Sequence, residues 1–244
     1  MPVGTMAGEE VGLSQLSAFS SQLSALDYCI LLRVASSSPY FSLEPTEGLL
    51  LLRLLSEDGT NRLSCSCIRA LTDAVTVLAQ DAKPLIITGN SRFFSVGADL
   101  AEIATLTAPA AHEFSKMGQK LMNVIELFPG PLFAAVHGYC MGGGLDLALA
   151  CHRRIASPHA IFGHRGASLG LITGWGGTQR LPRLVGKAKG LELLVAAAKV
   201  HASDALRIGL VDAVAEDPVA EAAQRIRNSQ EWIKSIGDLI AQGR

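Results

Sequence analysis

The chain has 244 residues with a net charge of -1, and 49% of them are hydrophobic. That length and apolar content suit one core-forming domain, and the balanced charge, without a basic tract, argues against nucleic acid as the main partner. Five cysteines without a paired framework fit a reducing cytosol, and neither a signal peptide nor a membrane-spanning segment is expected.

The first part of the chain, residues 1–46, is expected to be a poorly defined extension. Its serine-rich segments surround a stretch, 26–34, that could form one short helix. Pro39 and Pro45 bracket a predicted loop.

An alternation of strand and helix patterns begins after this extension. The leucine-rich stretch 48–55 is predicted to be a buried strand, and 56–60 a turn. An amphipathic helix is expected over 64–80, followed by a second buried strand over 84–89. The order strand, helix, strand predicts a parallel pair joined by a right-handed crossover.

The next units repeat this order. A glycine-containing loop at 90–100 follows the second strand, a helix is expected over 109–128, and another strand over 132–136. Ligands of open parallel sheets bind at the carboxyl ends of strands. We therefore expect the loops after the strands to form the site.

Three glycines, Gly142-Gly143-Gly144, follow the last of these strands and precede a helix-forming series. The first amides of a helix have no internal partner and lie at the positive end of its dipole, so this turn could hold an anion or polarise a carbonyl. Asp146, one turn into the helix, could face the same ligand. A close helix–strand contact explains the glycines equally well.

Four motifs together resemble the enoyl-CoA hydratase/isomerase (crotonase) superfamily. The resemblance spans roughly residues 47–215 and rests on FSVGADL at 94–100, HGYCMGGGLDLA at 137–148, GGTQRLPR at 176–183 and ALRIGLV at 205–211. It implies an α/β fold, a crotonase-like spiral of ββα units over 47–200 with a short C-terminal helical region over 201–244.

The resemblance also implies an activity, a substrate and an assembly. The expected activity is that of an enoyl-CoA hydratase/isomerase, a lyase or isomerase of fatty acid metabolism in the cytoplasm. Coenzyme A would enter as part of an acyl-CoA substrate, with no permanently bound cofactor and no metal. A homotrimer or hexamer is expected, without nucleic acid or membrane partners.

Site residues carry over by position. The oxyanion amides fall on Ala98 and Gly143. The coenzyme A contacts fall on Arg62, Leu63, Ala98, Asp99, Leu100, Gly142 and Gly143.

The sequence departs from the family at the catalytic acids. A typical hydratase has two glutamates; the first falls on Asp146 and the second on Gly166, which has no side chain. The neighbouring His164 and Arg165 could be surface or intersubunit residues. They could also hold a carboxylate or bicarbonate in the missing position, as is thought of dihydroxynaphthoyl-CoA synthases. Because only one carboxylate is left, a degenerate, non-catalytic coenzyme A-binding subunit is an alternative function.

Two further expectations concern the second half of the chain. The G-x-S-x-G pattern at 166–170 would suit a serine hydrolase only if a helix followed the serine directly, and glycines follow instead. Helices are expected over 181–198, interrupted near Gly186, and as two short amphipathic segments over 218–228 and 230–241.

Overall fold

The computed structural model describes residues 38–46 and 48–241, with side chains up to residue 229. The short helix expected over 26–34 lies outside the described residues. Within the described residues, no helix is long and apolar enough to cross a bilayer.

The larger of the sheets confirms the predicted parallel strands. Its spatial order is β1 (Phe41–Thr46), β2 (Leu49–Leu54), β4 (Leu85–Thr88), β7 (Leu132–Val136), β9 (Arg153–Ala156) and β12 (Ala213–Val214). β1 and β2 are antiparallel, and every other neighbouring pair is parallel.

β1 corrects the loop that was predicted between Pro39 and Pro45. Pro45 lies within β1, opposite Leu50 of β2. β1 is the outermost strand of its sheet, where the missing N–H of a proline does not break a ladder on both sides. The ordered fold therefore begins before residue 47.

A second sheet runs in the order β11 (Val200–His201), β10 (Ile161–Gly163), β8 (Tyr139–Met141) and β5 (Phe93–Ser95), and a small one pairs β3 (Arg62–Leu63) with β6 (Gly97–Ala98). The chain passes from the large sheet to the second sheet and then to a helix in β4–β5, β7–β8 and β9–β10. This repeat is the expected spiral of ββα units. Since β11 and β12 complete the sheets, the core extends beyond residue 200.

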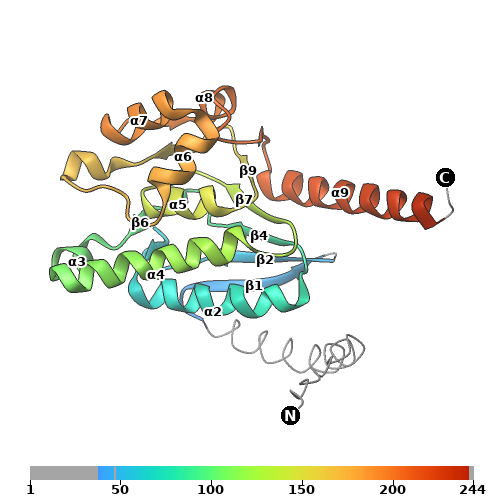
Figure 1. Cartoon of the computed structure of the whole chain (residues 1–244), viewed down its shortest axis with the longest axis horizontal. Coiled ribbons are helices and arrows are strands. Elements are labelled where there is room, and N and C mark those ends of the chain that lie inside the picture. The colour runs from blue at the N-terminus through green and yellow to red at the C-terminus, as the bar shows by residue number, and fades with distance from the viewer. Residues whose placement is uncertain (1–37, 47, 242–244) are drawn as a thin grey trace, which may run out of the picture.

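The helices cover both faces of the large sheet. They are α2 (Cys65–Asp81), α3 (Leu100–Ala104), α4 (Ala108–Glu126), α5 (Gly143–Ala150), the 3-10 helix η1 (Arg165–Leu169), α6 (Gly177–Val185), α7 (Lys187–Val195), α8 (Ala202–Arg207) and α9 (Pro218–Ala241). α2 and α4 lie side by side and enclose the main core with α5 (Figure 1). The Ser64 hydroxyl caps α2 by accepting from Cys67 N at 3.2 Å.

The C-terminal segment forms one helix rather than two. α9 packs Ala222, Ala223 and Ile226 against the other face of the large sheet and then extends away from the body of the protein (Figure 1). Neither glycine nor proline stands near residue 229, so nothing in the backbone chemistry ends the helix there.

Candidate active site

A cavity of about 370 Å³ lies where β6, the start of α5, η1 and the segment before α6 meet. Its lining includes six of the predicted site residues, namely Ala98, Leu100, Gly142, Gly143, Asp146 and Gly166. The remaining lining is largely apolar and comes from α3, α4 and the segment that follows η1. The tertiary fold thus gathers segments between Val96 and Leu194 into one pocket.

The glycine-rich turn gives the cavity its backbone amides. Gly142 has φ of 53° and ψ of -122°, and its N–H donates to Gly163 O at 2.9 Å. Gly143 opens α5, so its amide has no acceptor within the helix. The Gly143 amide, not that of Gly142, is therefore the donor that this turn can offer to a ligand.

The loop of Ala98 touches the same turn. A Cβ on Gly97, which has φ of 92°, would lie 2.6 Å from Gly143 N and 2.7 Å from Met141 O. Any side chain at Gly97 would separate the two loops. This close approach places Ala98 and Gly143 at one end of the cavity.

Asp146 is the acid of the cavity, and it is almost completely enclosed, with 1% of its surface exposed. Its Oδ2 accepts a hydrogen bond from the Thr173 hydroxyl. Its Oδ1 lies 3.3 Å from Nε2 of His164, which is itself 4% exposed. Oδ1 and the His164 Nε2 make no hydrogen bond within the described residues.

Gly177, the first residue of α6, makes room for this pair. A Cβ at Gly177 would lie 2.1 Å from Asp146 Oδ1 and 2.8 Å from His164 Nε2. Only a residue without a side chain leaves the two groups in their observed positions.

Trp175 forms a wall of the cavity and is also part of the core, with 3% of its surface exposed. Its indole is held between two glycines, because a Cβ on either Gly118 or Gly143 would lie 2.2 Å from a ring carbon. Phe114 packs edge-on at 5.3 Å between centroids. The aromatic wall is thereby fixed against the amide of Gly143.

Three residues predicted to contact coenzyme A do not line the cavity. Leu63 is buried to 1% and lies opposite Ala98 in the β3–β6 pair, so its side chain serves the core. Asp99 caps α3 by accepting from Ala101 N at 2.8 Å. Arg62 is paired with Asp58, and its guanidinium also lies 3.6 Å from Asp99. The hydrogen bond between Arg62 and Asp58 lowers the pKa of Asp58 and raises the pKa of Arg62.

A side chain at Gly166 would meet the backbone of the segment that follows η1. A Cβ on Gly166 would lie 2.9 Å from Leu171 O, and Arg165 is exposed. His164 is not a surface residue but points inward beside Asp146. The side-chain alternation of an extended segment could have indicated this, since the buried Phe162 of β10 and His164, directly after the strand, are two residues apart.

The G-x-S-x-G pattern does not form a nucleophile elbow. Ser168 lies within η1, and its hydroxyl donates to Arg165 O at 2.7 Å. The chain then turns at Gly170 in the left-handed conformation instead of entering a helix after the serine. This geometry removes the support for a serine hydrolase.

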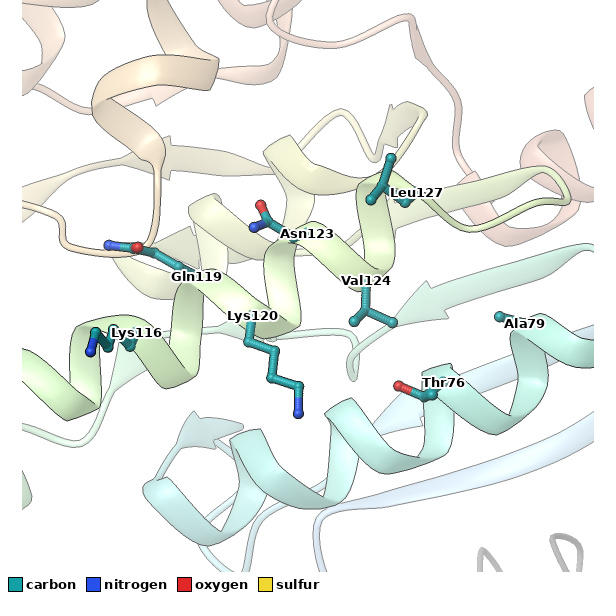
Figure 2. A pocket seen from close by; sticks show the side chains of 8 residues that line it. All are labelled: Thr76, Ala79, Lys116, Gln119, Lys120, Asn123, Val124 and Leu127. Carbon is teal, nitrogen blue, oxygen red and sulfur yellow. The ribbon is translucent and has the colours of Figure 1, made fainter. Parts of the chain in front are cut away.

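A second hollow, of about 490 Å³, lies between α2 and α4. Figure 2 shows that Thr76 and Ala79 come from α2 and that Lys116, Lys120 and Leu127 come from the α4 side. Its ionisable lining consists of lysines, so it lacks a carboxylate or imidazole to accept a proton near neutral pH. The chemistry therefore points to the smaller cavity, although it has less volume. Nowhere in the described residues do three or more metal-ligating side chains cluster.

The ββα spiral, with a helix-start glycine turn facing a buried acid, defines the crotonase class of α/β proteins. The family profile described as enoyl-CoA hydratase/isomerase matches residues 44–243. The chain belongs to the enoyl-CoA hydratase/isomerase family and is an enzyme of that type.

Individual relatives agree with the family. The crotonyl-CoA hydratase of Syntrophomonas wolfei is 42% identical over 71% of this chain and 68% of its own length. The probable enoyl-CoA hydratase of Bacillus subtilis is 40% identical over 74% of each. The solved enoyl-CoA hydratase of Bacillus anthracis is 33% identical, with a TM-score of 0.72 over 80% of this chain and 77% of that one.

Proposed function

We propose that the protein acts on short enoyl-CoA thioesters and stabilises a thioester enolate between the amides of Ala98 and Gly143. The observation that carries this proposal is the Gly143 amide, which opens α5 without an intrahelical acceptor and shares a cavity with Ala98 and Asp146. Coenzyme A enters as part of the substrate, and no permanent cofactor takes part. The similarity to the crotonyl-CoA hydratase of Syntrophomonas wolfei supports the enoyl substrate class.

The chemistry follows from where charge develops. Attack on the β carbon of an enoyl thioester moves electron density onto the thioester oxygen, and two fixed N–H groups stabilise that oxygen more strongly in the transition state than in the substrate. One such donor is worth about 10²–10³ in rate. The positive end of the α5 dipole adds to this stabilisation.

Asp146 handles a proton or orients the attacking water. The Thr173 hydroxyl holds Oδ2, which leaves Oδ1 as the oxygen available for proton transfer. A positioned acid or base contributes about 10²–10⁴ in rate. The apolar lining and the Phe114–Trp175 wall favour a small, uncharged acyl group in the cavity.

Two alternatives stay open to test. A degenerate coenzyme A-binding subunit is motivated by the absence of a side chain at Gly166. A bicarbonate-assisted reaction requires space beside Gly166 and a cation that points into the cavity. It has less support, because Leu171 O lies close to Gly166 and the Arg165 side chain is exposed.

For the assembly and location, we propose a homotrimer or hexamer in the cytoplasm. Exposed apolar side chains on α6 and α7 support an interface there: Leu184, Leu191 and Val195 are 37%, 63% and 69% exposed. Such side chains grouped on neighbouring helices are typical of interaction surfaces. Sedimentation that shows a stable monomer at micromolar concentration would contradict this assembly.

The deciding experiment is turnover of a panel of enoyl-CoA esters beside a coenzyme A-binding assay. We expect hydration of the short esters, whereas binding without turnover of any ester would support the non-catalytic alternative. A dependence of the rate on added bicarbonate in carbonate-free buffer would support the bicarbonate alternative.

A second experiment tests the oxyanion site directly. Gly143→Pro removes the amide donor, but the new ring would collide with Trp175, so the variant is made in a Trp175→Ala background. Relative to Trp175→Ala alone, we expect a further loss of about 10²–10³ in kcat. The infrared stretch of a ¹³C-labelled thioester carbonyl should also shift to lower frequency on binding to the wild type, and equal turnover by the two variants would contradict the oxyanion assignment.

A further inference from the structure

The cavity has an unusual set of ionisable side chains. Among its described lining residues, Asp146, His164 and Arg165 are the ones that ionise, and Arg165 is exposed. Addition of water to an enoyl thioester requires that a proton is taken from water and that a proton is delivered to the α carbon. Since Gly166 supplies no acid and arginine does not release its proton, Asp146 and His164 are the side chains left for both tasks.

The geometry brings these two side chains together from different elements. His164 follows β10 and Asp146 lies on α5, yet Nε2 and Oδ1 are 3.3 Å apart. Both side chains are at least nine-tenths buried. A Cβ on Gly177 would collide with both atoms, so there is no space for a side chain between α6 and the pair.

The pair is also incompletely bonded. Asp146 Oδ1 and His164 Nε2 lie within ion-pair distance, but neither makes a hydrogen bond within the described residues. Buried polar atoms without a partner are costly, and these two line the cavity in which the substrate is proposed to bind. A water molecule or a reacting group in the cavity would complete their hydrogen bonding.

We propose that Asp146 and His164 form an acid–base pair in which His164 supplies the proton that a second carboxylate would otherwise supply. This inference rests on the proposed function. The step starts from the pair with one proton, carried by His164. Asp146 Oδ1 takes a proton from water as the water oxygen bonds to the β carbon, and the π electrons move onto the thioester oxygen as an enolate.

The second half of the step restores the pair. The enolate collapses as its α carbon takes the proton of His164 Nε2, and the thioester carbonyl re-forms. The proton now on Asp146 passes across the 3.3 Å gap to His164. The β carbon has then gained the hydroxyl group of water, and the α carbon has gained one proton from His164. The proton taken from water returns to His164 through Asp146, so no other reactant is needed.

The surroundings leave Asp146 as the charged partner of the imidazole. On α6, Gly177 lies next to the ring and carries no side chain; Arg165 on η1 and His201 on β11 are exposed, and Cys140 on β8 directs Sγ to Gly144 O at 3.5 Å. Burial raises the pKa of the Cys140 thiol well above its usual value, so it stays neutral. Asp146 is therefore the ionisable side chain that lies against the imidazole.

The pH dependence follows with a definite sign. Activity requires the pair to carry one proton, so it falls when alkali removes that proton from the imidazolium and falls again when acid protonates the carboxylate. A bell-shaped profile of kcat against pH is expected for the wild type. A role for His164 in positioning alone would leave no limb that depends on the imidazole.

The test compares the wild type with His164→Gln over pH 5–9, using a short enoyl-CoA. Glutamine keeps an N–H that can reach Asp146 but cannot release a proton. We expect kcat to fall by about 10²–10⁴ with KM changed little, the alkaline limb to disappear, and exchange of the product's α-hydrogen with D₂O to be lost. Retention of kcat within about threefold, with the same pH profile, would overturn the acid–base pair.

Two measurements keep the test decisive. If His164→Gln does not fold by thermal melting and circular dichroism, the pH profile of the wild type decides, because a profile without an alkaline limb overturns the proposal. If the wild type turns over no enoyl-CoA, the proposed function fails and the inference fails with it. If the wild type is active and His164→Gln behaves identically, only the inference fails.

Discussion

Replacement of Gly177 by alanine is the sharpest structural perturbation of the active site. The added methyl would lie 2.1 Å from Asp146 Oδ1 and 2.8 Å from His164 Nε2. Ordinary van der Waals contact begins near 3.4 Å, so the carboxylate oxygen must retreat by roughly 1.3 Å or α6 must move by a similar amount. Gly177→Ala therefore displaces the Asp146 carboxylate without removing any polar group.

The expected magnitudes differ for activity and stability. A misplacement of about 1 Å in a catalytic group costs about 10²-fold in rate, so kcat should fall by about two orders of magnitude. Overpacking of a filled site costs about 1–3 kcal/mol, which leaves a domain of this size folded. Gly177→Ala should therefore yield a folded, binding-competent and slow enzyme.

The assay follows the loss of the ultraviolet absorbance of the conjugated enoyl thioester, together with thermal melting and coenzyme A binding. Gly48→Ala is the matched control, because Gly48 has φ of 84° and no atom within 4 Å of the added Cβ. The control should lose about 1–2 kcal/mol of stability from its left-handed backbone and keep its kcat. A Gly177→Ala enzyme with wild-type kcat would refute the placement of Asp146 and His164 as the reacting pair.

Two further predictions concern the rest of the fold. Asp212→Ala should lower the free energy of unfolding by about 3–5 kcal/mol, because the buried Arg154, 4% exposed, loses the carboxylate that lies 3.4 Å from its guanidinium. Arg153→Ala removes the exposed ion pair to the same aspartate and should lower the free energy of unfolding by at most about 1 kcal/mol. Denaturant unfolding measures both changes. Iodoacetamide at pH 8 should label the half-buried Cys65 before Cys151, because burial raises the pKa of the Cys151 thiol to about 12. Peptide mass spectrometry measures the order of labelling, and labelling of Cys151 first would contradict its buried position.

Much of the fold was determined by local patterns in the sequence. Buried strands at 48–55, 84–89 and 132–136 and the long helices between them were predicted correctly, because apolar runs and 3.6-residue periodicity reflect burial directly. The parallel pairing of the strands followed from their alternation with helices. The position of the glycine turn before α5 and of Asp146 within it also followed from the sequence.

Other elements depended on their neighbours in space. Pro45 favours a loop over the residues that form β1, and only the place of β1 at the edge of the sheet makes that proline acceptable. The two helices expected after residue 217 proved to be the single α9. Local sequence contains no information on whether the neighbouring strand or core will accept such a segment.

The approach of His164 to Asp146 was decided by the tertiary structure. His164 and Asp146 are 18 residues apart on different elements, and no sequence motif links them. Their approach to 3.3 Å depends on the parallel pairing of β8 and β10 and on the absence of a side chain at Gly177. A sequence pattern reports which residues can do chemistry, but the distance between two side chains is set by how whole elements pack, and that packing brings an imidazole beside the one carboxylate that the cavity retains.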